Sequence, residues 1–305
     1  MELNLIGQTA ALATSCLWTF NSIFFTEAGR RIGSLSVNAY RILMAVGFLS
    51  VAHVILSGNL LPVASTEQWF WIGMSGIVGL GIGDFGLFTA FVIIGPRRSV
   101  LMMALSPIFA SVGAFLMLGE TISPLAIIGI AVTLGGVVWV IFEREDQPRE
   151  RPIQERLKAW GALLALVGAM GQGIGLVFAK KGIFIELGMM VNPLSAALIR
   201  MVFGAVFVWM SALFVGRLPE LRETLDNKEG IKYTAAGAFT GPFLGVTLSM
   251  VAVAYTQAGI AQTLMSLMPV FIIPLVWILY GQRTSWRGIL GAAVATVGVA
   301  VLYLI

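Results

Sequence analysis

The sequence has little charge, a single histidine and a single cysteine. Only 11% of its 305 residues are Asp, Glu, Lys or Arg, whereas a soluble domain averages about 25%. Cys16 has no second cysteine with which to form a disulfide, and neither Cys16 nor His53 belongs to a metal-binding spacing. These shortages exclude an ordinary water-soluble enzyme, a disulfide-stapled secreted domain and a zinc protease. We expect no metal and no other cofactor.

Apolar residues dominate instead. Hydrophobic side chains make up 58% of the chain, and the mean hydropathy is +0.93. A helix needs about 20 mostly apolar residues to span a bilayer. Ten runs of that kind are present, at 5–26, 37–57, 69–93, 99–118, 124–142, 159–178, 194–215, 233–256, 260–280 and 286–304. The sequence therefore predicts an all-α integral membrane protein with ten transmembrane helices.

One polar segment divides these ten spans into two sets of five. Residues 143–158 read EREDQPRERPIQERLK, which is almost wholly polar and contains two prolines. We therefore predict a first five-helix domain over 1–142, a charged linker over 143–158 and a second five-helix domain over 159–305.

The two halves repeat each other at an offset of 162 residues. The matched pairs are Pro107 with Pro269, Phe109 with Phe271, Gly119 with Gly281, Gly129 with Gly291, and Gly136 with Gly298. Because each half has an odd number of spans, the halves must be inverted relative to each other. Inverted repeats place a substrate site near the bilayer midplane, at the interface between the repeats. This repeat is the strongest functional signal in the sequence.

The basic residues fall mostly on one face of the predicted bundle. Fifteen lie in the loops after spans one, three, five, seven and nine, and only Lys180 and Lys181 lie on the other face. Cytoplasmic loops are enriched in Lys and Arg. We therefore predict a multi-pass protein of the cell (inner) membrane, with the linker 143–158 in the cytoplasm and both termini outside. Since topology explains the basic charge, no nucleic-acid partner is expected.

Asp84 is an acidic residue near the middle of span three. A charged side chain at the bilayer centre costs about 2.5–3.5 kcal/mol on insertion scales unless it faces a cavity or a partner. The surrounding glycines, Gly79, Gly81, Gly83 and Gly86, would let a ligand or a neighbouring backbone come close. We expect Asp84 to bind substrate and to carry protons for antiport. The alternative is a structural aspartate that ties spans three and four together.

Three other charged residues receive structural interpretations. Arg41 and Arg200 lie about one turn inside their spans, from where so long a side chain reaches the interface at little cost. The alternative is that either points inward, toward a substrate carboxylate or Asp84. Glu120 lies in the turn between spans four and five, where we expect its carboxylate to cap span five near Ser123.

Polar side chains of other spans complete a candidate cavity. Thr14, Trp18 and Asn21 share one helix face in span one, where Trp18 is placed to stack on an aromatic or cationic substrate; helix packing is the alternative. The further candidates for substrate binding are Gln172, Tyr255, Gln262 and Ser266. Pro107 and Pro269 each free a backbone carbonyl one turn earlier, and we interpret them as structural hinges bordering the cavity.

The doubled motif resembles that of a known family. SPIF at 106–109 and GETIS at 119–123 in the first half recur as MPVF at 268–271 and GQRTS at 281–285 in the second. This arrangement resembles two tandem EamA domains of the drug/metabolite transporter superfamily and covers essentially the whole chain. The resemblance implies a ten-helix secondary carrier, commonly an exporter of amino acids, other small metabolites or toxic organic compounds. It also implies a central cavity lined by spans one, three, four, six, eight and nine. Gln282 departs from the family, which usually has Glu there.

We therefore interpret the protein as a secondary carrier, and not an enzyme, that exports a small metabolite by alternating access and proton antiport. Its partners would be that metabolite, protons and the lipid bilayer, and it would work as a monomer or homodimer. A flippase-like carrier of lipid-linked substrates and an uncoupled facilitator are the alternatives. An ATPase and an aspartyl protease are excluded, because no GxxxxGK[ST] loop occurs and Asp84 has no acidic partner at mid-span.

Overall fold

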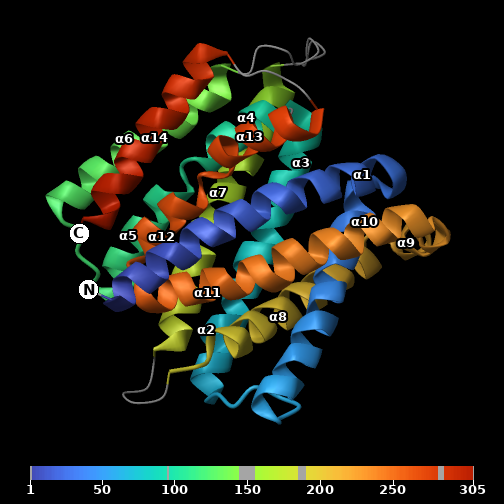
Figure 1. Ribbon diagram of the computed structural model, residues 1–305. Helices are drawn as coiled ribbons and strands as arrows, with labels where there is room; N and C mark the ends of the chain where they lie inside the picture. Colours follow the sequence, from blue (N-terminus) through green and yellow to red (C-terminus); the bar gives the residue numbers. More distant parts are fainter. Residues whose placement is uncertain (1, 95, 144–154, 185–189, 281–284, 305) are drawn as a thin grey trace.

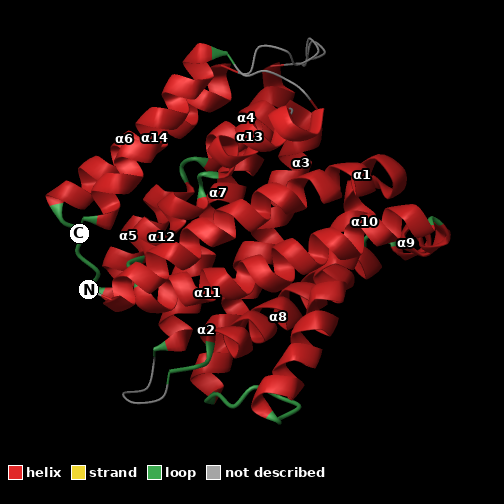
Figure 2. Cartoon of the chain, in the orientation of Figure 1, coloured by secondary structure: helices red, strands yellow, loops and turns green. Residues whose placement is uncertain are grey.

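The computed structural model describes residues 2–94, 96–143, 155–184, 190–280 and 285–304. Nearly all of them are helical, and Figure 2 shows no strand in this part of the chain. The prediction of an all-helical fold is confirmed. Within the described residues, nine helices are long and apolar enough to cross a membrane, which is the architecture of a multi-pass membrane protein. Ten such segments were expected.

The difference between nine and ten lies in α1, Glu2–Ser57, which takes in both of the first two apolar runs. Its 56 residues would extend roughly 84 Å as a straight helix, against about 30 Å for the hydrocarbon core of a bilayer. The helix turns at Gly33, whose φ of 77° is left-handed and is open to glycine at no steric cost. Figure 1 shows two arms that diverge from this turn. The count of nine treats both arms as one helix.

Shorter helices follow α1 in both halves. The first half continues with α2 (Thr66–Gly76), η1 (Ile77–Gly83), α3 (Asp84–Ile94), α4 (Pro96–Met103), α5 (Ser106–Leu118) and α6 (Pro124–Glu143). The second half contains α7 (Glu155–Ile183), α8 (Pro193–Phe214), α9 (Leu218–Glu223), η2 (Thr224–Asp226), α10 (Lys228–Ala238), η3 (Phe239–Gly245), α11 (Val246–Tyr255), α12 (Ala258–Met265), α13 (Met268–Tyr280) and α14 (Trp286–Tyr303).

The halves break their helices at matching places. In the first half, the π-helical turn η1 separates α2 from α3, and residues 104–105 separate α4 from α5. In the second half, the π-helical turn η3 and residues 266–267 do the same, each 162 residues later. Pro242 in η3 has no backbone N–H to donate, and the glycines of η1 weaken a regular α-helix. The repeat in sequence is therefore also a repeat of helix irregularities.

The last helices of the two halves, α6 and α14, pack with their backbones in close contact. A Cβ atom built on Gly136 would lie 2.6 Å from the Gly291 carbonyl oxygen, and one built on Gly129 would lie 3.3 Å from the Gly298 carbonyl oxygen. Small residues are what allow membrane helices to approach this closely. Because early residues of α6 meet late residues of α14, the two helices run antiparallel.

The two ends of the chain lie together. Gln8 Nε2 in α1 donates a 2.9 Å hydrogen bond to the Leu302 carbonyl oxygen in α14, and Figure 1 places the N and C labels on one side of the molecule. The predicted linker 143–158 is in part helical, because α7 begins at Glu155. Residues 144–154 of that linker lie outside the described residues.

Candidate functional site

A cavity of about 260 Å³ lies between the two halves, where η1, η3 and the helix breaks come together. Sites for small molecules are commonly about 300–1,000 Å³, so this cavity suits a small solute. Matched residues line it from both halves: Leu80 and Asp84 from the first, and Pro242 and Val246 from the second, 162 positions later.

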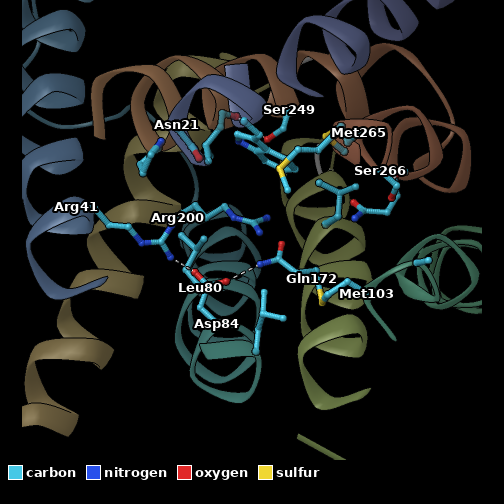
Figure 3. Close-up of a pocket in the computed structure, with 18 of the residues that line it drawn as sticks. Asn21, Arg41, Leu80, Asp84, Met103, Gln172, Arg200, Ser249, Met265 and Ser266 are labelled. Atoms are coloured by element: carbon cyan, nitrogen blue, oxygen red, sulfur yellow. Dashed lines mark hydrogen bonds and ion pairs between the residues drawn. The ribbon is translucent and has the colours of Figure 1, made fainter. Parts of the chain in front are cut away.

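Asp84 begins α3 directly after η1, and it is only 5% exposed. Its Oδ2 atom forms an ion pair with Nη2 of Arg41, and its Oδ1 atom accepts a 2.8 Å hydrogen bond from Gln172 Nε2 (Figure 3). Arg41 Nε in turn donates to Asn38 Oδ1 over 2.9 Å. One partner of the carboxylate comes from α1 and the other from α7, so Asp84 joins helices of the two halves.

Arg200, in α8, lines the same cavity and is only 3% exposed. Its Nη1 atom makes two long hydrogen bonds, of 3.3 Å to the Gly175 carbonyl oxygen and 3.5 Å to Ser75 Oγ, while its Nε atom has no hydrogen-bond partner. A Cβ atom built on Gly79 would lie 2.6 Å from Arg200 Nη2. The glycine at this position therefore makes room for the guanidinium group.

The interpretation of Arg41 and Arg200 as interface-seeking side chains is wrong. Both line the cavity. Asp84 and Asn38 give Arg41 polar partners inside the bundle, and the Gly175 carbonyl oxygen and Ser75 give them to Arg200. The sequence also allowed inward-pointing arginines, but it could not decide between the two orientations, since the direction of a long side chain depends on which helices surround it.

Six of the seven predicted substrate-binding residues line the cavity: Trp18, Asn21, Asp84, Gln172, Gln262 and Ser266. Gln262 Nε2 donates a 2.9 Å hydrogen bond to Ser106 Oγ, and Ser266 Oγ donates one of 2.8 Å to the Gln262 carbonyl oxygen. Tyr255 is not among the lining residues. It is the last residue of α11, and its backbone packs against Gly7 near the start of α1.

The two predicted hinge prolines follow the matched helix breaks. Pro107 and Pro269 are the second residues of α5 and α13, where a missing N–H costs the helix nothing. The preceding turn is tight in both halves: Ala104 N donates to the Leu101 carbonyl oxygen over 3.2 Å, and Ser266 N donates to that of Thr263 over 3.1 Å. Pro269 lines the cavity, whereas Pro107 is buried beside it. Their action as hinges stays a prediction.

The cavity also has an apolar wall that sequence reasoning missed. Its larger members are Ile42, Leu80, Leu87, Met103, Val137, Ile141, Leu176, Met201, Val246, Met265 and Met268. They come in part from spans two, five and seven, which the family resemblance did not assign to the cavity. In a membrane helix nothing in the sequence separates an apolar residue that lines a cavity from one that packs against a neighbour.

A second ion pair joins the halves near the chain ends. Lys180 Nζ, in α7, lies 2.5 Å from Glu120 Oε1 in the turn between α5 and α6, and it also donates a 2.5 Å hydrogen bond to the Thr256 carbonyl oxygen. Glu120 Oε2 accepts a 3.0 Å hydrogen bond from the backbone N–H of Ala258, the first residue of α12.

The interpretation of Glu120 as the cap of span five is therefore wrong. Ser123 holds that position itself, since its Oγ atom accepts a 3.1 Å hydrogen bond from Ala126 N at the start of α6. Glu120 caps a helix of the opposite half instead. Gln282, its counterpart in the second half, lies outside the described residues.

The described residues hold no group of three His, Cys, Asp or Glu side chains that could bind a metal ion. The cavity offers charged groups, amides and hydroxyls together with apolar side chains. Such a lining can bind and release a small solute.

Comparisons with known proteins agree with this description. The sequence profile of the EamA-like transporter family matches residues 5–142 and 159–304. The Probable transport protein YPL264C of Saccharomyces cerevisiae is 26% identical over 162 residues, which are 52% of this chain and 45% of that protein. The chain thus matches less than half of this relative's length.

A protein of known crystal structure superposes on the chain with a TM-score of 0.74 at 18% identity, covering 99% of this chain and 96% of the other. At this identity the likeness shows the fold alone. The two profile matches cover nearly all of the sequence, one in each half. The chain therefore belongs to the EamA-like transporter family.

Proposed function

We propose that this protein is a secondary carrier that exports a small metabolite by alternating access. The observation that carries the proposal is the position of the cavity, between two halves whose helices break at matching places. Broken helices at a repeat interface are the usual surroundings of a transporter's substrate site. The antiparallel contact of α6 with α14 supports an inverted repeat, since equivalent helices of inverted halves run in opposite directions.

Alternating access requires contacts that can be broken and remade between the halves. Asp84 provides such contacts, because its two oxygens bind Arg41 of one half and Gln172 of the other. A solute that enters the cavity competes with these side chains for hydrogen bonds. Binding and rearrangement of the two halves would then be linked through the same few groups.

We also propose that protons are coupled to transport through Asp84. A lone carboxylate among buried helices is a common proton relay in transporters. Protonation would release Arg41 from its ion pair and change the charge of the cavity. Antiport, the form expected from the sequence, is one outcome; the sign of the coupling depends on the charge of the solute.

Transport by the purified protein in liposomes tests the proposal. Uptake of a labelled metabolite panel is measured with and without an imposed pH gradient, for the wild-type protein and for Asp84→Asn. A proton-coupled carrier shows gradient-driven uptake that Asp84→Asn loses while exchange of solute across the membrane persists. Gradient-independent uptake in both proteins would make the protein a facilitator and Asp84 a packing residue.

A carrier of lipid-linked substrates is the second candidate, and it predicts a different result. Its transport would require a lipid anchor on the solute, because the anchor stays in the bilayer while the head group crosses. Uptake of free water-soluble metabolites by the liposomes would therefore count against it.

A further inference from the structure

The charged groups of the cavity do not balance. Among the described residues that line it, the charged side chains are Arg41, Arg200 and Asp84. Arg41 and Asp84 form an ion pair, so the charge of Arg200 gives the cavity lining a net charge of +1. A buried charge is costly unless it is paired, so the cavity favours a ligand with one negative charge.

The hydrogen bonds of Arg200 point the same way. A guanidinium group has five N–H donors, and the bonds made here are two long ones from Nη1, while Nε is unpaired in a residue that is only 3% exposed. Buried donors almost always have partners. Figure 3 shows the Arg200 side chain among the labelled cavity residues, between Arg41 and Gln172. The donors of Nη2, which make no hydrogen bond to any described residue, are therefore available to a ligand in the cavity.

The rest of the lining describes the remainder of that ligand. Val246 is the counterpart of Asp84, and Pro242 is the counterpart of Leu80, so the η3 side of the cavity lacks the charged group of the η1 side. Trp18 packs against Gly245 on this side, with its Nε1 atom 2.7 Å from the position of a Cβ atom built there. A solute that fits has an anionic group at one end and an apolar body at the other.

We infer that Arg200 is an anion-binding site and that the solute is a small organic anion, with its carboxylate or similar group on the guanidinium and its apolar body against the Val246 side. The inference rests on the proposed carrier function and names its substrate class. It also sets the sign of the coupling. Protonated Asp84 would leave both arginines unbalanced and strengthen the attraction for an anion, so proton and anion travel together rather than in exchange.

Binding of three probes with one skeleton and different charges tests the inference. N-acetyl-L-leucine carries one negative charge at neutral pH, N-acetyl-L-leucinamide is neutral, and L-leucinamide is a cation. Each is added at millimolar concentration to the full-length protein in detergent, and the shift in thermal unfolding gives an apparent Kd. We expect the anion alone to stabilise the wild-type protein.

Variants of opposite charge make the test specific. Arg200→Gln should raise the Kd of the anion about tenfold or more, since it removes a charge-assisted hydrogen bond. Asp84→Asn should keep or lower that Kd, because it adds to the positive charge of the cavity. If the site bound cations instead, Asp84→Asn would raise the Kd of the cation and Arg200→Gln would keep or lower it.

Gly79→Ala provides a second test, because Arg200→Gln could fail to fold. The added methyl group falls 2.6 Å from Arg200 Nη2, the far end of a flexible side chain, and displaces the guanidinium group without removing it. We expect weaker anion binding by a protein that still folds. Gly47→Ala is the matched control, since a Cβ atom at Gly47 has no neighbour within 4 Å.

Several results would overturn the anion site. The first is that the cation stabilises the wild-type protein and that Asp84→Asn abolishes this stabilisation. The second is that all three probes stabilise the protein equally or that none does. The third is that anion binding is unchanged in both Arg200→Gln and Gly79→Ala. Liposome uptake separates this failure from failure of the carrier. Uptake of neutral or cationic probes by Arg200→Gln would preserve the carrier and refute the anion site, whereas anion binding without any uptake would refute the carrier.

Discussion

Arg41 and Asp84 each carry a charge, and a charge inside a helical bundle is costly unless an opposite charge or hydrogen-bond partners lie beside it. The ion pair is held on both sides, since Arg41 Nε donates to Asn38 and Asp84 Oδ1 accepts from Gln172. Removing one member of such a pair typically costs about 3–5 kcal/mol, because the other charge is left buried and unbalanced. Loss of one member alone is therefore expected to destabilise the protein.

This leads to a prediction for a double-mutant cycle. Arg41→Gln should lower the free energy of unfolding by roughly 3 kcal/mol, at the lower end of that range because the Arg41 side chain is 12% exposed. Adding Asp84→Asn should recover most of the lost stability, because both positions then carry neutral amide side chains and no unpaired charge remains between them. Unfolding in detergent, monitored by near-UV circular dichroism, measures both. Single effects that simply add would mean that the two charges are not coupled.

Sequence reasoning located Asp84 and Gln172 as site residues, but it gave the contact of Arg41 with Asp84 only as an alternative. Asp84 was identifiable because a carboxylate at mid-span is too costly to lie there without a cavity or a partner. Gln172, Gln262 and Ser266 were identifiable as polar side chains in apolar spans. Arg41 and Arg200 were placed at the interface because a single helix offers them no partner inside the bundle; the packed helices supply Asp84 to the one and the Gly175 carbonyl oxygen to the other.

At the scale of elements, the seam between α6 and α14 depends on glycine at one position and not at the next. A Cβ atom on Gly136 would lie 2.3 Å from Ala295 N, whereas one on Gly135 has no neighbour within 4 Å. Gly136→Ala must therefore push two helices apart, and overpacking of this kind costs about 1–3 kcal/mol.

The matched control is Gly135→Ala, which should be neutral or add up to about 1 kcal/mol of stability through helix propensity. Thermal unfolding of the two variants, purified in the same detergent, compares them. Equal stability of Gly135→Ala and Gly136→Ala would contradict the close contact between α6 and α14.

The helices themselves were largely predictable and their irregularities were not. Runs of about 20 apolar residues fix where helices lie, and Pro107 with Pro269 marked the breaks in the fourth and ninth spans. The π-helical turns were less visible in the sequence. In the second half η3 contains Pro242, but in the first half η1 contains glycines and no proline, and glycines are compatible with a regular helix. That η1 and η3 occupy equivalent positions is seen only in the structure, because the formation of a π-helical turn depends on the neighbouring helices that pack against it.

At the scale of the whole molecule, Lys180 and Glu120 hold the two halves together at the end where the chain starts and finishes. Each side chain reaches across: Lys180 to a turn of the first half, and Glu120 to the first N–H of α12 in the second. If the halves rock about the cavity, this pair must open whenever the solute passes that end. Weakening the pair should then favour the conformation in which the cavity is reached from the chain-end face.

Labelling of a single cysteine would detect that shift. In a Cys16→Ser background, Ser266→Cys places one thiol in the cavity lining, and a membrane-impermeant maleimide is applied to the face that carries the chain ends. We expect Lys180→Met to raise the labelling rate several-fold, because the loss of one cross-half ion pair destabilises the closed state relative to the open state. The matched control is Lys181→Met, which removes the neighbouring positive charge but leaves the Glu120–Lys180 pair in place, since the ammonium group of Lys181 lies 3.9 Å from the centre of the Trp71 ring. Equal rates in the wild-type protein and Lys180→Met, or the same rise in Lys181→Met, would show that the Glu120–Lys180 pair does not control access to the cavity.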